Sequence, residues 1–184
     1  ARGGDDGLRL GGVFRARGTP QKLFAHQNAP KLRHNAIDLQ RSARVFGVPY
    51  RMPVGQPFRT VTALRSLLVV GPPYQDLMHD FYRAYWAEGR DIGQDEVVAS
   101  ILAARGLDAA AILEKTKDAE VKAELRRRTD QAIERGVFGA PACFVDGQLY
   151  WGQDRFDLVE RALGHEPIED VPQSFVHPVE VWFD

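Results

Sequence analysis

The feature that most constrains the fold of this chain is a change of periodicity at Gly136. Between residues 73 and 135, apolar side chains recur every three or four positions, the spacing that lines one face of a helix. Glycines and short polar turns divide this block into four predicted helices, at 74–88, 94–105, 108–115 and 119–135. The middle of the chain is therefore expected to be helical.

After Gly136 the pattern becomes that of strands. Two short apolar segments, 143–145 and 149–151, flank Asp146-Gly147, a pair typical of a tight hairpin turn. A last helix is predicted over 154–163. Because an X-Pro bond readily adopts the cis form, Ala140-Pro141 before the first strand is a candidate cis peptide. Helices followed by a hairpin predict an α/β protein.

The first 72 residues contain fewer regular elements. An apolar stripe predicts a helix over 31–46, and a second helix is expected to open at Thr60. Residues 8–10 are expected to end a strand, from which residues 11–14 turn away. No element is predicted for the glycine-rich opening, for the loop at 19–30 or for the tail from Gly164 onward.

Charge and residue usage exclude several classes of function. The 184 residues include 24 Lys and Arg against 25 Asp and Glu, so a net charge of −1 provides no field for binding nucleic acid or an acidic membrane. A single cysteine, Cys143, leaves no internal disulfide, Cys-x-x-Cys pair or cysteine-rich zinc site. No apolar run approaches the roughly 20 residues of a membrane span. We expect a cytoplasmic protein without nucleic-acid or membrane partners.

The side chains that most often carry chemistry have ordinary roles in this pattern. The five histidines lack the spacing of metal ligands, so no metal site is predicted. Cys143 falls within an apolar strand, where a buried, unreactive thiol is expected rather than a nucleophile. At helical spacing, Tyr82, Tyr85 and Trp86 favour packing, with an aromatic substrate pocket as the alternative.

Several separate segments between Leu10 and about Leu163 resemble one family. They are Gly11-Gly12-Val13-Phe14; Pro30-Lys31, Asp38-Leu39 and Arg41; Phe81 to Trp86 with Gly89 to Ile92; Gly136 to Pro141; Phe144 to Gly147; and Trp151 to Arg155. On these segments the chain resembles the 2-hydroxychromene-2-carboxylate isomerase and kappa-class glutathione transferase family of the DsbA-like thioredoxin superfamily. The resemblance implies a thioredoxin-like fold with an inserted all-helical subdomain.

The resemblance also implies how the chain is divided. Residues 1–72 correspond to an incomplete amino-terminal thioredoxin-like half and 73–135 to the inserted helical subdomain. Residues 136–163 correspond to the carboxy-terminal half, with cis-proline, hairpin and helix, and 164–184 to a tail. Compared with the family, the first β-strand and helix are missing from the sequence, as is the serine-proline-aromatic segment whose hydroxyl binds the glutathione sulfur. No catalytic residue is therefore predicted.

The activity that the resemblance implies is glutathione-dependent isomerisation of 2-hydroxychromene-2-carboxylate during the breakdown of aromatic hydrocarbons. Glutathione is the implied cofactor: its thiol adds to the small aromatic carboxylate substrate, permits rotation about a former double bond and leaves unchanged. The resemblance also implies a homodimer. Two alternatives remain, a kappa-like glutathione transferase, which consumes thiol, and a truncated, non-catalytic thioredoxin-fold binding module.

Six residues are predicted to bind glutathione: Ala140, Pro141, Gln153, Asp154, Arg155 and Arg59. A cis bond exposes the backbone N–H and C=O of Ala140, with which an extended cysteinyl backbone is able to pair like an added strand. At the start of the last helix, unpaired N–H groups attract a carboxylate and Asp154 attracts an ammonium, the two charges of the γ-glutamyl end. The alternative is that Gln153 and Asp154 only cap the helix.

Arg59 is a departure from the family pattern. Where the family usually shows an asparagine before Ser or Thr, this chain has Arg59-Thr60. A guanidinium is able to bind a substrate carboxylate or the glycyl end of glutathione, but it lacks the acceptor oxygen of an amide. Without a hydroxyl on the sulfur, the expectation is glutathione binding with little isomerase turnover.

Overall fold

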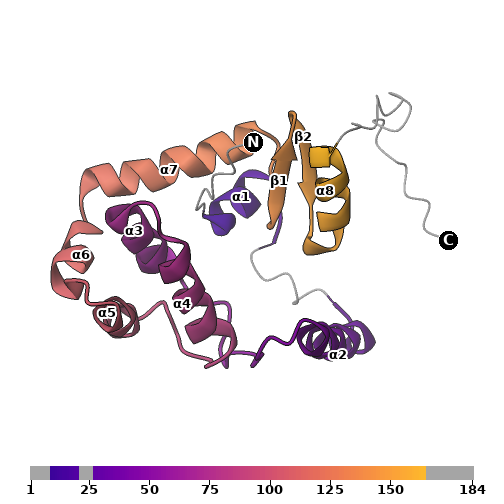
Figure 1. Ribbon diagram of the computed structural model, residues 1–184, viewed down its shortest axis with the longest axis horizontal. Coiled ribbons are helices and arrows are strands. Elements are labelled where there is room, and N and C mark those ends of the chain that lie inside the picture. The colour runs from indigo at the N-terminus through magenta and orange to yellow at the C-terminus, as the bar shows by residue number, and fades with distance from the viewer. Residues whose placement is uncertain (1–8, 21–26, 165–184) are drawn as a thin grey trace. The chain divides into compact units, whose positions relative to one another are not determined.

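The computed structural model of the chain describes residues 9–20 and 27–164 (Figure 1). The chain divides into two compact units, residues 1–138 and 139–184. The first unit contains α1 (Leu10–Ala16), α2 (Ala29–Val45), α3 (Val61–Val70), α4 (Gln75–Trp86), α5 (Asp95–Ala104), α6 (Ala109–Lys115) and α7 (Ala119–Glu134). The second contains β1 (Ala142–Val145), β2 (Gln148–Trp151), the 3-10 turn η1 (Gln153–Arg155) and α8 (Phe156–Gly164).

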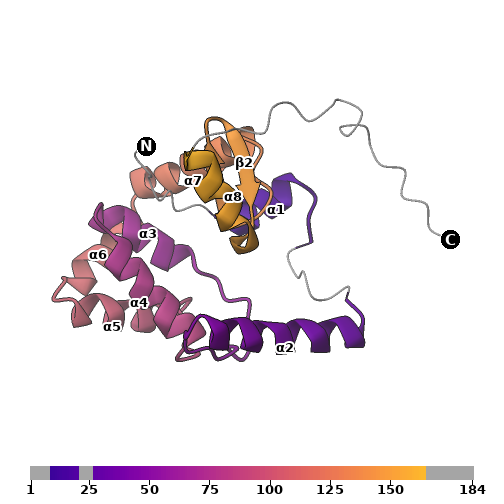
Figure 2. The ribbon, with the colours of Figure 1, turned by 45° about the vertical axis from the view of Figure 1, so that its right-hand side comes forward.

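The core of the first unit is built from α3, α4 and α5. Its buried apolar side chains line one face of each helix, as the sequence predicted, and Ile92 joins them from the turn between α4 and α5. They are Ala63, Leu67, Leu77, Phe81, Ala84, Tyr85, Ile92, Val98, Ile101 and Leu102. Helix α6 packs on α3 and α5, and α7 packs on α3 (Figures 1 and 2). The four helices predicted between residues 73 and 135 are confirmed as α4 to α7.

Local signals fix where several of these helices begin and end. The side chain of Asn28 accepts a hydrogen bond from the N–H of Lys31 at 3.0 Å at the start of α2. Asp108 accepts one from the N–H of Ala111 at 3.0 Å at the start of α6. Gly106 follows the end of α5 with a φ of 72°, a left-handed conformation that glycine adopts without a steric penalty.

Helix α1 shows that the predicted strand end and turn at residues 8–14 are wrong. The carbonyl of Arg9 accepts hydrogen bonds from the N–H groups of Gly12 (2.8 Å) and Val13 (3.3 Å), which begins a helix. Val13 is fully buried, and a Cβ added at Gly12 would lie 3.0 Å from Cγ2 of Thr129 on α7. Packing on α7 thus stabilises a helix that two glycines disfavour. Leu8 lies outside the described residues.

Helix α2 confirms the helix predicted over 31–46, but its apolar stripe is not buried against the described residues. None of its side chains is buried, and Leu32 and Leu39 are 38% and 41% exposed. The helix opening at Thr60 is confirmed as α3.

The second unit contains the predicted hairpin. Strands β1 and β2 are antiparallel, with Ala142 opposite Trp151 and Val145 opposite Gln148. Asp146 and Gly147 have φ angles of 47° and 84°, as a two-residue hairpin turn requires. Helix α8 packs on β1 (Figure 1). The predicted tail lies almost wholly outside the described residues.

In residues 9–20 and 27–164, no helix combines the length and apolar character that crossing a membrane requires. Among these residues, no three His, Cys, Asp or Glu side chains are grouped so as to hold a metal ion.

Candidate functional site

The loop before β1 exposes a backbone donor and acceptor. The Ala140-Pro141 bond is cis, as the sequence predicted. Ala140 is exposed, and neither its N–H nor its C=O has a hydrogen-bond partner among the described residues. The carbonyl of Pro141 accepts a hydrogen bond from the N–H of Gly152 at 3.0 Å, so the loop is tied to the end of β2. This connection brings residues 140–141 and 152–155 into one site.

Two glycines are required for this local geometry. A Cβ at Gly139 would clash with the indole nitrogen of Trp151, because the ring lies against the loop backbone. Gly152 has a φ of 106°, and a Cβ there would collide with Oδ1 of Asp154. A side chain at Gly139 would therefore collide with Trp151 at the end of β2, and one at Gly152 would collide with Asp154 in the following turn.

The last helix begins differently from the prediction. Residues 153–155 form the 3-10 turn η1, and the α-helix starts only at Phe156. Gln153 and Asp154 thus lie in a tight turn that precedes the α-helix. The N–H of Arg155 donates to the carbonyl of Gly152 at 3.2 Å, and Nη1 of Arg155 lies 2.7 Å from Oδ2 of Asp154. Both side chains of this ion pair are more than half exposed.

Five of the six residues predicted to bind glutathione therefore lie together in the second unit. Arg59 lies in the first unit, between Phe58 and the start of α3. Its backbone is held by the turn before α5, since a Cβ at Gly93 would lie 2.9 Å from the carbonyl oxygen of Arg59. Oδ1 of Asp91 accepts the N–H of Gly93 at 2.8 Å and fixes that turn.

An aromatic group lies beside the Arg59 segment. Tyr50 stacks on Trp86 with ring centroids 6.1 Å apart, and Trp86 meets Tyr85 edge to face at 4.5 Å. Phe58 meets Tyr85 at 5.4 Å. Arg51 joins the segment to α4, because its N–H donates to the carbonyl of Trp86 at 2.6 Å.

The sequence prediction found only part of this aromatic group. Packing is confirmed for Tyr85, which is 7% exposed, whereas Tyr82 is 53% exposed. Tyr50 and Phe58 were missed, because they fall in a proline-rich segment without periodicity. The signal that could have indicated them is an aromatic residue at each end of that segment.

Burial sets the protonation of the two tyrosines in this group. It raises the pKa of Tyr50. Burial also raises the pKa of Tyr85. The negative charge of Asp91 raises this pKa further, whereas a backbone hydrogen bond from Phe58 lowers it. Both phenols are therefore neutral near pH 7 and available as hydrogen-bond donors; that of Tyr85 lies 3.5 Å from Oε1 of Gln56.

Cysteine and serine side chains are the remaining candidates for a nucleophile. Cys143 lies in β1 and is partly buried, and it is a free thiol. Ser66 on α3 is fully buried, and Ser100 on α5 donates to the carbonyl of Val97 at 2.8 Å. Ser66 and Ser100 belong to the first unit, whereas Cys143 follows the Ala140 loop on β1.

The second-unit site has groups that fit a short peptide with charged ends. An unpaired N–H and C=O at Ala140 match an extended backbone. Asp154 and Arg155 offer one charge of each sign for an ammonium and a carboxylate. Glutathione carries all of these groups, so the residues present fit it.

The fold and this loop define the class of protein. A family model described as a DSBA-like thioredoxin domain matches residues 8–164. The chain therefore belongs to the DSBA-like thioredoxin domain family.

The chain is similar to 2-hydroxychromene-2-carboxylate isomerases in both sequence and structure. A 2-hydroxychromene-2-carboxylate isomerase of Sphingobium xenophagum is 33% identical over 138 residues, which are 73% of this chain and 69% of the relative. The solved structure of a selenomethionine 2-hydroxychromene-2-carboxylate isomerase superposes with a TM-score of 0.75 at 25% identity, covering 86% of this chain and 78% of that one. The predicted thioredoxin-like fold is thereby confirmed.

A second kind of relative is a glutathione transferase. Glutathione S-transferase kappa 2 of Caenorhabditis elegans is 34% identical over 140 residues, which are 66% of this chain and 61% of the relative. The relatives thus include isomerases and transferases, and both groups are enzymes.

Proposed function

We propose that this protein is a glutathione-dependent isomerase of the 2-hydroxychromene-2-carboxylate type. The observation that carries the proposal is the unpaired, exposed backbone of Ala140, on a chain that superposes on such an isomerase. When bound, glutathione supplies a thiol as the nucleophile. We assign no residue of this chain to the sulfur.

The second unit binds the peptide part of glutathione in this proposal. The N–H and C=O of Ala140 pair with the cysteinyl backbone, and Pro141 and Gln153 shape the loop on either side. Asp154 binds the γ-glutamyl ammonium, while Arg155 binds its carboxylate. These contacts recognise backbone and charge, so they hold the ligand whatever the ionisation of its thiol.

The aromatic substrate has a matching surface in the first unit. Trp86, which contacts both Tyr50 and Tyr85, is 37% exposed, and Arg59 directly follows Phe58 at one end of the aromatic group. A ring and a carboxylate on one small molecule suit an aromatic surface beside a guanidinium.

A kappa-like transferase is the second candidate, favoured by the 34% identity to a kappa relative. Titrating free thiol during turnover separates the two reactions. An isomerase regenerates each thiol, so the thiol concentration stays constant, whereas a transferase consumes one thiol for each product.

The binding step is tested by titrating glutathione into the wild-type chain and into Asp154→Ala in a calorimeter. Loss of a charged contact of about 1.4 kcal/mol corresponds to about tenfold weaker binding. Asp157→Ala removes the same charge three residues later, in the first turn of α8, and is expected to bind like wild type. Equal affinity of all three proteins would remove the 153–155 turn from the proposal.

Catalysis and assembly are measured on the same preparations. The isomerase reaction is followed spectrophotometrically with and without glutathione, and conversion independent of glutathione would contradict the proposal. We also propose that the chain forms a homodimer, for which sedimentation should give about twice 20.6 kDa.

A further inference from the structure

Three arginines of the first unit come together near the start of α3. Arg9 precedes α1, Arg59 precedes Thr60 at the start of α3, and Arg65 lies one turn into α3. Helix α7 packs on both α1 and α3, and Oγ1 of Thr129 on α7 accepts the N–H of Arg9 at 3.1 Å. Burial lowers the pKa of Arg65, and repulsion by Arg59 and Arg9 lowers it further. Their charges are thus close enough to act on one another.

The carboxylate of Asp91 lies near the backbone of Arg59, but no carboxylate of the described residues is paired with any of the three guanidinium groups. In residues 9–20 and 27–164, the side chains of Arg9, Arg59 and Arg65 form no ion pair and no hydrogen bond. The Nε of Arg65 is buried without a partner. Native proteins rarely leave a buried charged donor unpaired, because no hydrogen bond then offsets the free-energy cost of removing the donor from water. An external anion that contacts the accessible atoms of these three side chains would offset their charge.

The start of α3 adds backbone N–H groups, which carry partial positive charge and are hydrogen-bond donors. Thr60 makes no side-chain cap, and the first backbone hydrogen bond of the helix comes from Leu64 to the carbonyl of Thr60 at 3.1 Å. The three N–H groups before Leu64 have no partner among the described residues. These groups carry the positive end of the ten-residue α3 next to Arg59.

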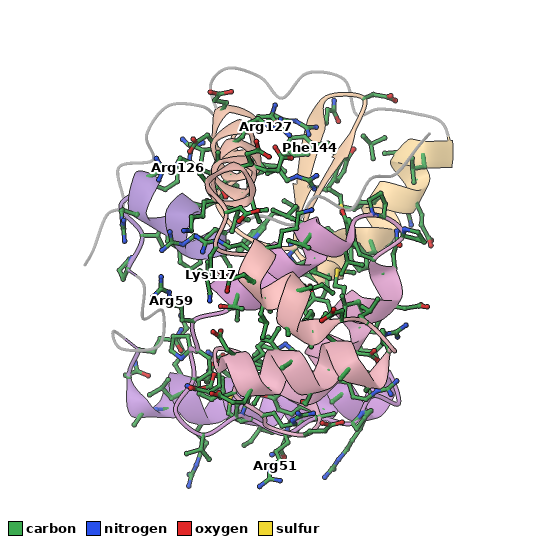
Figure 3. All side chains as sticks on the ribbon, turned by 90° about the vertical axis from the view of Figure 1, so that its left-hand side faces the viewer. Arg51, Arg59, Lys117, Arg126, Arg127 and Phe144 are labelled. Carbon is green, nitrogen blue, oxygen red and sulfur yellow. The ribbon has the colours of Figure 1, made fainter. Side chains whose placement is uncertain are left out.

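The surroundings of Arg59 indicate what kind of anion is bound. Phe58, its neighbour in the chain, belongs to the aromatic group with Tyr85 and Trp86. Arg59 and Arg51, at the two ends of this segment, are labelled in Figure 3. Guanidinium groups bind carboxylates in a planar, paired geometry, and an aromatic ring packs on neighbouring aromatic side chains.

We propose that Arg9, Arg59 and Arg65 form a carboxylate-binding site at the amino end of α3 that holds the carboxylate of a small aromatic acid. The identification of this acid as a substrate rests on the proposed function, whereas the site itself rests on the unpaired arginines. Arg65 is the principal binding residue, because it is the least exposed of the three and water screens its charge least.

The test uses salicylate as the probe and the full chain at low ionic strength. Calorimetric titration compares wild type with Arg65→Met, which preserves an unbranched side chain but removes the charge. Arg126→Met on the exposed face of α7 is the matched control (Figure 3). We expect at least tenfold weaker binding by Arg65→Met and a change of less than twofold for Arg126→Met. Without ligand, Arg65→Met should melt at a higher temperature than wild type, because a repelled, desolvated charge is gone.

Two further variants test the site independently, in case Arg65→Met does not fold. Arg59→Gln removes an exposed charge, and Gly93→Ala displaces the backbone of Arg59 without changing any charge. Both should weaken salicylate binding. Wild-type affinity in Arg65→Met and Arg59→Gln together would overturn the proposal, and so would a failure of wild type to bind salicylate saturably.

Other probes distinguish the source of the anion and the fate of the proposed function. Salicylamide, which has no carboxylate, should bind wild type and Arg65→Met equally. Inorganic phosphate binding as tightly as salicylate would overturn the aromatic-acid assignment. Salicylate binding that depends on Arg65 in a chain that binds no glutathione would leave the site standing and contradict the proposed function. If the chain binds glutathione but binds salicylate equally well with and without Arg65, the result would contradict the arginine site and leave the proposed function standing.

Discussion

Arginine side chains in this protein fall into two groups according to their partners. Arg105 binds Asp80, and Arg127 and Arg128 bind Glu124 on α7. These arginines are exposed or half-exposed, and their pairs follow helix spacing or link adjacent helices. Arg9, Arg59 and Arg65 have no such pairs among the described residues, and Arg65 is the one with a buried, unpartnered nitrogen. The buried, unpartnered nitrogen thus distinguishes Arg65 from the arginines that pair with acidic side chains.

The Glu124 pairs predict a specific dependence of stability on pH. Hydrogen bonds from Arg127 and Arg128 lower the pKa of Glu124 from 4.5 to about 2. A pKa that is lower in the folded than in the unfolded chain stabilises the fold above pH 4.5, and this contribution is lost as the pH falls toward 2. Glu124→Gln should therefore lower stability at pH 7, on the order of 0.5 to 1 kcal/mol for exposed pairs.

Urea unfolding at a series of pH values measures this difference. The deficit of Glu124→Gln should shrink between pH 4.5 and 2 and be small below pH 2. Glu134→Gln, at the end of the same helix and outside the ion pairs, should show no deficit at pH 7. A deficit for Glu124→Gln that stays constant down to pH 2 would contradict the assignment.

Sequence patterns predict residues well where the chain is locally determined. The cis Ala140-Pro141 bond and the Asp146-Gly147 turn followed from residue types at adjacent positions. The ring contact of Phe58 with Tyr85 did not, because no local pattern encodes which loop meets which helix. The roles of the six residues predicted to bind glutathione remain predictions.

At the scale of elements, hydrophobic periodicity located most helices and misassigned one. The helix predicted over 119–135 is observed as α7, Ala119–Glu134, because its period is uninterrupted. Helix α1 was missed since Gly11 and Gly12 favour a turn by local propensity. The packing of Val13 on α7 decides its conformation, and a contact between residues more than one hundred positions apart leaves no local signal.

The packing of α5 predicts the cost of a core cavity. Leu102 is fully buried in the core of the first unit, so Leu102→Ala should lower the free energy of unfolding by about 2–5 kcal/mol. Leu39→Ala, on the 41% exposed position of α2, should change it by less than about 0.5 kcal/mol. Chemical denaturation followed by far-ultraviolet circular dichroism measures both. Equal costs for the two variants would contradict the proposed core.

For the whole molecule, the sequence indicated the class of fold but not its units. The resemblance and the strand signals after Gly136 predicted a thioredoxin-like fold, and the solved isomerase supports it with a TM-score of 0.75. The chain divides between Phe138 and Gly139. The division at 72, 135 and 163 stays a proposal, because apolar spacing reveals which faces are buried and not which elements unfold together.

The make-up of the second unit predicts that it does not fold alone. Among residues 139–164, Val145 is the buried apolar side chain, and the two strands have four residues each. An isolated hairpin is marginally stable, and the nine residues of α8 are fewer than the roughly 12 that an isolated helix needs. A peptide of residues 139–164 should therefore show no cooperative thermal transition in circular dichroism. Residues 9–138, which contain the ten-residue core, should show one. A cooperative transition in the short peptide would mean that the hairpin and α8 stabilise each other without a larger core.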